Sequence, residues 1–178
     1  MAHGTIDAIL SFDIDPNEIE EVVVETFEMA YSILARDPKR WSPETRETAD
    51  HSLPYLLARA ILDRKIDLQA FSKEKIKDPA VHNFILEKIK ILVNEKHTNM
   101  YPEALPTKVI IKLQNGNVLK KEILYPRGHA RNPLDYAEII QKFKNLAGEH
   151  SNFLDTVKKA ESIKLLFEKL NQYSGGYL

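Results

Sequence analysis

The chain contains no cysteine among its 178 residues. This excludes a disulfide scaffold, a thiolate zinc site and an iron–sulfur cluster held by its own side chains. A reducing cytoplasm is compatible with this composition, and we expect a cytoplasmic protein. The six histidines do not show the spacing of a helical zinc motif, since His82 and His97 fall in separate predicted elements. We therefore expect no metal site.

Four further features are missing from the sequence. No apolar run approaches the roughly 20 residues that cross a bilayer, and the first residues do not have the pattern of a signal peptide. There is no glycine-rich phosphate loop. The 25 basic and 26 acidic residues give a formal net charge of −1, so no global basic field attracts nucleic acid or acidic membrane. We expect a soluble protein that binds neither.

The local patterns that are present predict an α+β fold. Residues 19–27 are rich in valine and indicate a strand, with Val22, Val23 and Val24 buried on both faces, and residues 90–94 indicate a short second strand. Residues 108–114 and 117–125 flank Asn115 and Gly116, the preferred pair of a two-residue type I′ hairpin. We expect a small mixed sheet containing this hairpin, helices packed on it, and a helical C-terminal extension at 151–173.

Helices are predicted at several places along the chain. Residues 5–12 form a short one, and 79–89 an amphipathic one. Ser52 precedes Leu53 and Pro54, which is typical of an N-cap followed by proline in the first turn. Asn132 is expected to cap a further helix that begins at Pro133 and ends at Gly148.

The stretch 48–63 also carries candidates for chemistry. Asp50, His51 and Ser52 lie at the start of its helix, where backbone N–H groups favour a bound anion such as a carboxylate. A histidine exchanges protons near neutral pH, and a tyrosine such as Tyr55 donates a hydrogen bond. The commoner interpretation of such a stretch is a well-capped core helix. His3 and the basic loop at 126–133 are the remaining candidates.

Five motifs, in order, resemble the MmgE/PrpD family. They are HGTIDAIL at 3–10, ADHSLPYLLARAILD at 49–63, DPAV at 78–81, YPEALPTKV at 101–109 and YPRGHARNPLD at 125–135. Together they span most of the chain.

The resemblance implies a specific architecture. Family members have a large helical domain, built from the N-terminal part and the C-terminal helices, and a smaller inserted α+β lid domain. Residues 1–148 would then be the lid and 149–178 the helical extension, while the N-terminal helical domain would be absent from this chain. His3 matches an active-site histidine at the lid boundary and Tyr55 an active-site tyrosine. An aspartate, a second histidine and two lysines of the family site would lie upstream.

The implied activity is that of a cofactor-independent hydro-lyase, resembling 2-methylcitrate dehydratase and acting on a tricarboxylic acid. His51, Arg127, His129 and Arg131 are candidates for contacting this substrate. Decarboxylation or epimerisation of a related polycarboxylate is an open alternative, and so is a non-catalytic assembly protein that keeps the lid fold. We expect a homodimer, or a partner chain that supplies the helical domain.

Overall fold

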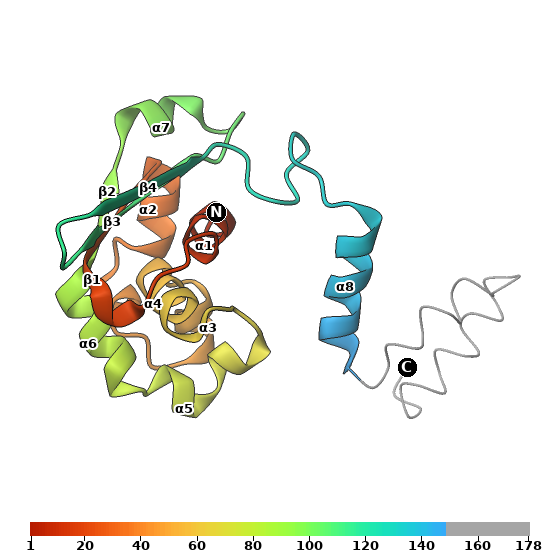
Figure 1. Ribbon diagram of the computed structural model, residues 1–178. Helices are drawn as coiled ribbons and strands as arrows, with labels where there is room; N and C mark the ends of the chain where they lie inside the picture. Colours follow the sequence, from red (N-terminus) through yellow and green to blue (C-terminus); the bar gives the residue numbers. More distant parts are fainter. Residues whose placement is uncertain (149–178) are drawn as a thin grey trace, which may run out of the picture. The chain divides into compact units, whose positions relative to one another are not determined.

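The computed structural model describes residues 1–148, and in them the chain has an α+β fold (Figure 1). One mixed sheet has the strand order β2-β1-β3-β4. Its strands are β1 (Ile19–Thr26), β2 (Ile89–Val93), β3 (Thr107–Leu113) and β4 (Val118–Ile123). β1 pairs in parallel with β2, whereas the pairs β1–β3 and β3–β4 are antiparallel. The predicted mixed sheet with its hairpin is therefore confirmed.

The two faces of this sheet differ in character. Val22 and Val24 of β1 and their partners Ile111 and Val109 of β3 are buried on one face. On the other face, Glu21 binds lysines from both neighbouring strands. Val23 lies on this second face and is only partly buried. The prediction that the valine run is buried on both faces is therefore wrong, because one face is largely polar.

The hairpin turn has three residues in its loop and is not of type I′. The N–H of Leu113 donates to the carbonyl of Asn117 at 2.8 Å, and the N–H of Gly116 to that of Leu113 at 2.9 Å. Gly116 has φ +85°, whereas Asn115 is not among the residues with positive φ. A type I′ turn requires positive φ at both central residues. The asparagine instead accepts a hydrogen bond from the N–H of Asn117 at 2.9 Å.

Helices precede, connect and follow these strands along the chain. They are α1 (His3–Leu10), α2 (Glu28–Leu34), α3 (Arg46–Asp50), α4 (Leu53–Asp63), α5 (Lys73–Ile76), α6 (Pro79–Lys88), α7 (Glu95–Met100) and α8 (Tyr136–Ala147). Short 3-10 turns lie at Pro16–Glu18, Pro38–Arg40 and Leu68–Phe71. The helices α1, α4 and α6 occur where the sequence predicts them. The short helices α2, α3 and α7 were not predicted.

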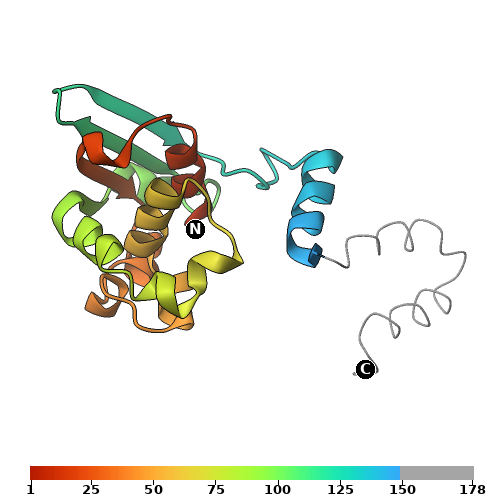
Figure 2. The same cartoon turned by 60° about the horizontal axis from the view of Figure 1, so that its bottom comes forward.

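Helices α1, α4 and α6 pack together against the sheet, with α4 in the middle (Figures 1 and 2). Residues Leu53 to Ile61 of α4 are all buried, so this helix is the centre of the core. Helix α1 approaches β3 and β4 closely at Gly4, where a Cβ atom would lie 3.0 Å from the side chain of Thr107. The glycine therefore lets α1, and His3 with it, lie directly on the sheet.

The chain divides into two compact units, residues 1–132 and residues 133–178. In the second unit, α8 begins after a capping box made by Asp135 and Glu138. The predicted cap at Asn132 is therefore wrong, since an acidic residue three positions later satisfies the first turn. The helix ends at Gly148 as predicted. The boundary expected at residue 148 stays a prediction, and the helix expected at 151–173 lies outside the described residues.

None of the helices within residues 1–148 combines the length and the apolar character that a membrane span requires.

Candidate functional site

The turn between α3 and α4 is fixed by Ser52, which is fully buried. Its hydroxyl oxygen accepts a hydrogen bond from the N–H of Tyr55 at 3.1 Å and its O–H donates to the carbonyl of Arg40. Pro54 stands in the first turn of α4. The predicted N-cap is confirmed. It places Asp50 and His51 at the entrance to the central helix.

His3 and His51 line one pocket of about 470 Å³, which we call the histidine pocket. The two residues are 48 positions apart in the sequence, and the packing of α1 against α4 brings them to the same cavity. Asp50 is the carboxylate of the lining. The remaining walls are mainly apolar, with Ile6, Ile33, Leu34, Leu56, Ile66 and Phe71. Two histidines, the residue type that serves most often as a general acid or base, thus border one partly apolar cavity.

His51 is held by its neighbour on the chain. Its Nδ1 lies within hydrogen-bond and ion-pair distance of a carboxylate oxygen of Asp50, and 3.3 Å from the carbonyl oxygen of Glu47. Both contacts are made by acceptors, so they favour the tautomer in which Nδ1 carries the proton. The other ring nitrogen, Nε2, is then the one that can take up or release a proton. A carboxylate that orients a histidine in this way is common in acid–base catalysis.

Tyr55 occupies a different place. Its side chain is 0% exposed, and its O–H donates to the carbonyl of Ala70 at 2.5 Å. Burial raises the pKa of the phenol, and the hydrogen bond from Arg59 opposes this shift. Tyr55 does not line the histidine pocket. Its enclosed hydroxyl favours a structural role, and the catalytic role implied by the resemblance stays a prediction.

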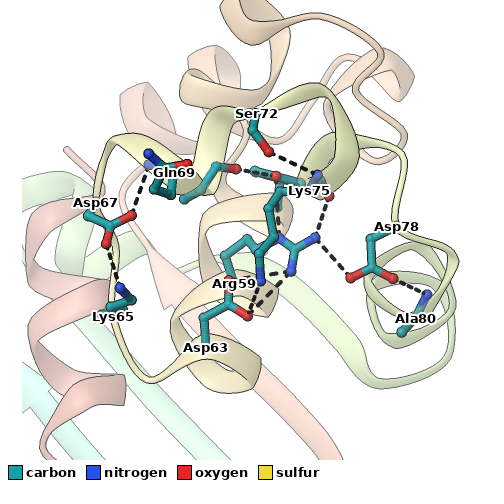
Figure 3. Close-up of polar contacts among 11 residues, drawn as sticks. Arg59, Asp63, Lys65, Asp67, Gln69, Ser72, Lys75, Asp78 and Ala80 are labelled. Atoms are coloured by element: carbon teal, nitrogen blue, oxygen red, sulfur yellow. Dashed lines mark hydrogen bonds and ion pairs between the residues drawn. The ribbon is translucent and has the colours of Figure 1, made fainter.

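Arg59, which the sequence analysis did not single out, has a buried guanidinium that organises a polar cluster (Figure 3). Its side chain is 1% exposed. The guanidinium donates to the hydroxyl of Tyr55 at 3.3 Å, to Asp63 at 3.4 Å and to Asp78 at 3.1 Å. It also donates to the carbonyl of Lys75, whose ammonium group binds Asp63 at 2.9 Å. We call these five residues the Arg59 cluster.

A sequence signal for this cluster exists in hindsight. Tyr55, Arg59 and Asp63 follow one another at intervals of four along an otherwise apolar helix, which places them on one face. An arginine among apolar positions needs partners when it is buried. The cluster ties α4 to the segment between α4 and α6, and all of its charges are compensated.

The basic loop forms a second cavity. Arg127 and Arg131 line a hollow of about 790 Å³ together with Asp7 and Lys121, among other residues. We call it the basic hollow. His129 is not part of this lining; its Nδ1 accepts the N–H of Arg131 at 3.1 Å. The six predicted site residues therefore divide between the histidine pocket, the core and the basic loop.

Metal ligation has no obvious place in this part of the chain. Within residues 1–148, no three side chains of histidine, aspartate or glutamate are grouped so that they could hold a metal ion.

Comparison with known proteins identifies the family of this chain. The model of the MmgE/PrpD C-terminal domain matches residues 1–171. The chain therefore belongs to the MmgE/PrpD family and corresponds to its C-terminal domain.

Among curated proteins, the chain is similar to cis-aconitate decarboxylase of Mus musculus. The two are 27% identical over 159 residues, which is 86% of this chain and 29% of that protein. The chain thus spans less than a third of the length of this relative.

Proposed function

We propose that the chain supplies the C-terminal-domain side of the active site of a cofactor-independent lyase that acts on a polycarboxylate. The observation that carries the proposal is that His3 and His51 border one pocket, with Asp50 beside His51. His3 acts as the base or the acid, and His51 as the second proton-transferring group. Asp50 positions His51.

The chemistry of a hydro-lyase explains why two such groups are needed. A base removes a proton next to a carboxylate, and an acid protonates the β-hydroxyl as it leaves. Cations hold the carboxylates and stabilise the enolate-like transition state. The described lining of the histidine pocket contains no lysine or arginine. We therefore propose that these cations come from outside residues 1–148, for example from a partner chain that carries the helical domain.

The preferred substrate is a tricarboxylic acid such as 2-methylcitrate. Decarboxylation is the alternative that the name of the mouse relative supports, and epimerisation of a related polycarboxylate is a third possibility. A non-catalytic assembly protein with the same fold is the candidate from a different class. Such a protein needs no proton transfer, so, unlike the lyase candidates, it does not require His3 or His51 as an acid or a base.

The test is an activity assay on the full chain with 2-methylcitrate and with cis-aconitate. Absorbance of the unsaturated acid reports dehydration, and released carbon dioxide reports decarboxylation. The variants are His3→Ala and His51→Ala, and His82→Ala is the matched control, because His82 does not line the histidine pocket. Circular dichroism confirms that each variant is folded. We expect turnover to fall at least a hundredfold in the first two variants and to persist in the control.

If the folded chain shows no turnover by itself, binding decides the question. NMR spectra of the histidine rings should then shift for His3 and His51, and not for His82, as citrate or 2-methylcitrate is added. Full turnover in both pocket variants contradicts the proposal. So does a chain with neither turnover nor shifts of these two rings.

Asp50→Asn tests the positioning role separately. We expect the ¹⁵N spectrum of the His51 ring to lose its preference for a proton on Nδ1, because an amide can face the ring with either its oxygen or its NH₂ group. An unchanged tautomer would show that Asp50 does not orient this ring.

A further inference from the structure

We propose that the basic hollow binds a small anion with at least two negative charges, a polycarboxylate or a phosphate, at a site separate from the histidine pocket. The proposal concerns Lys121 and Arg131. It does not depend on the proposed lyase activity, because it rests on a different cavity and on different residues.

The position of Lys121 is the first observation. In β4 it pairs with Val109 of β3, whose side chain is buried on the helix-covered face. Successive side chains of a strand point to opposite faces of the sheet, so Lys121 shares this face with Leu119 and Ile123. A lysine between two apolar positions breaks the pattern, and it lines the hollow next to Asp7 and Leu10 of α1. Its ammonium charge is therefore brought to the side of the sheet that α1 covers.

Arg131 is the second cation, and its guanidinium is held in place. One of its Nη atoms donates to the hydroxyl of Tyr125 at 2.6 Å, and its guanidinium carbon lies 5.2 Å from the centre of that ring. These contacts orient the side chain without neutralising it. Within residues 1–148, neither Lys121 nor Arg131 forms an ion pair with a carboxylate.

The two carboxylates of the hollow already have partners. Asp7 accepts the backbone N–H of Arg127 at 2.9 Å. Glu122 lies 2.9 Å from Nε2 of the buried His97. The acidic groups are thus engaged with these partners, while Lys121 and Arg131 keep donors available. This arrangement favours a ligand that brings its own negative charge.

The chemistry of the donors defines the ligand class. Arginine presents a planar fork that matches a carboxylate or a phosphate, and lysine adds a compact charge. A ligand with two or more charges can meet both at once. Carboxylate and phosphate ligands share this recognition, so the experiment must separate them.

The test measures binding of inorganic phosphate and of citrate to the full chain by calorimetry, with chemical shifts in NMR spectra to locate the site. The variants are Arg131→Gln and Lys121→Gln. Arg36→Gln is the control, because Arg36 is an exposed arginine paired with Glu28. His3→Ala separates this site from the histidine pocket. Circular dichroism and a melting curve confirm the fold of each variant.

We expect saturable binding of at least one anion, weakened about tenfold or more in each of the first two variants, because each variant removes one charge-assisted hydrogen bond to the anion. Arg36→Gln should bind both anions as the wild type does, and in His3→Ala the binding that the NMR shifts locate at the basic hollow should persist. Binding of phosphate alone identifies a phosphate site, of citrate alone a polycarboxylate site, and of both a general dianion site. Three results overturn the proposal. They are no saturable binding at millimolar concentrations, wild-type affinity in both the Lys121→Gln and the Arg131→Gln variant, and loss of binding at the basic hollow in His3→Ala.

Discussion

Arg59 and Arg131 each lie against a tyrosine, but their environments differ. The guanidinium carbon of Arg59 is 5.7 Å from the ring centre of Tyr55, and that of Arg131 is 5.2 Å from that of Tyr125. Each donates a hydrogen bond to the hydroxyl of its tyrosine. Arg59 is buried and also binds two carboxylates, whereas Arg131 is exposed and, among the described residues, binds none.

The difference follows from the cost of burying a charge. Removing a guanidinium from water is unfavourable by several kcal/mol unless partners compensate it. Arg59 in α4 has such partners, so its charge is compensated by carboxylates of the same protein. Arg131 keeps its hydration and pays no such penalty, so its charge remains available to a ligand. The same pair of residue types is thus structural in one environment and suited to binding in the other.

Replacing each arginine by methionine gives the largest contrast. Arg59→Met leaves Asp78 and the carbonyl of Lys75 without their buried donor, while Asp63 keeps its lysine. We expect the free energy of unfolding to fall by about 3 kcal/mol, the lower end of the range for breaking a buried pair. Arg131→Met should change it by less than about 0.5 kcal/mol, as for an ordinary surface substitution.

Urea denaturation of both variants measures this difference. Equal stability losses in the two proteins would show that the Arg59 cluster contributes no more than a surface contact.

The two tyrosines give a smaller contrast of the same kind. Tyr55→Phe removes the donor to Ala70 and the acceptor for Arg59, so we expect a loss of about 1–3 kcal/mol. Tyr125→Phe, at a partly exposed residue, should cost less than about 1 kcal/mol. Turnover per folded molecule should be unchanged in Tyr55→Phe, because its hydroxyl is enclosed. Strong loss of turnover in a protein that remains folded would instead support the catalytic role.

The same variant has a pH signature. Burial raises the pKa of Tyr55, so the folded protein holds the phenol proton more tightly than the unfolded chain does. The resulting stability is complete below the usual tyrosine pKa of about 10 and is lost as the pH rises toward the folded pKa. Denaturation curves of the wild type should therefore decline above about pH 10, and part of this decline should be absent in Tyr55→Phe.

The smallest effect is expected at Glu21, a charge on the polar face of the sheet that is 16% exposed. Hydrogen bonds from Lys112 and Lys90 lower the pKa of this carboxyl. Its stabilisation is therefore present above the usual glutamate pKa of about 4.3 and is lost as the pH falls. Glu21→Gln should cost less than about 1 kcal/mol at neutral pH.

Stability curves between pH 7 and pH 3 should therefore fall less steeply in Glu21→Gln than in the wild type. Parallel curves would show that the two lysines do not stabilise the ionised carboxylate.

Much of the fold could be predicted because local signals are strong in the sheet and at the central helix. Asn115 and Gly116 mark the hairpin, and Ser52 and Pro54 mark the start of α4. The turn type was missed because the extra loop residue changes which positions need positive φ. The short helices α2, α3 and α7 were missed because five to seven residues are too few for a periodic pattern.

The candidate site was harder to predict, because its residues are far apart in the sequence. Local patterns select His3, His51, Tyr55 and the basic loop as chemically capable. Only the packing of α1 and α4 reveals that the two histidines share a pocket and that the tyrosine is enclosed. Arg59 escaped notice because an arginine on an amphipathic helix is usually exposed, and its burial depends on carboxylates from two segments.

Helix α1 has a consequence for how the molecule would respond to its ligands. His3 and Ile6 form part of the wall of the histidine pocket, whereas Asp7 and Leu10 form part of the wall of the basic hollow. Both walls therefore include residues of the same eight-residue helix, which lies on the sheet at Gly4. A ligand that displaces α1 when it binds in one cavity would change the free energy of binding in the other cavity. Thermodynamic linkage makes this coupling free energy equal in both directions. Titrating each anion in the presence of the other would measure this coupling as a ratio of dissociation constants.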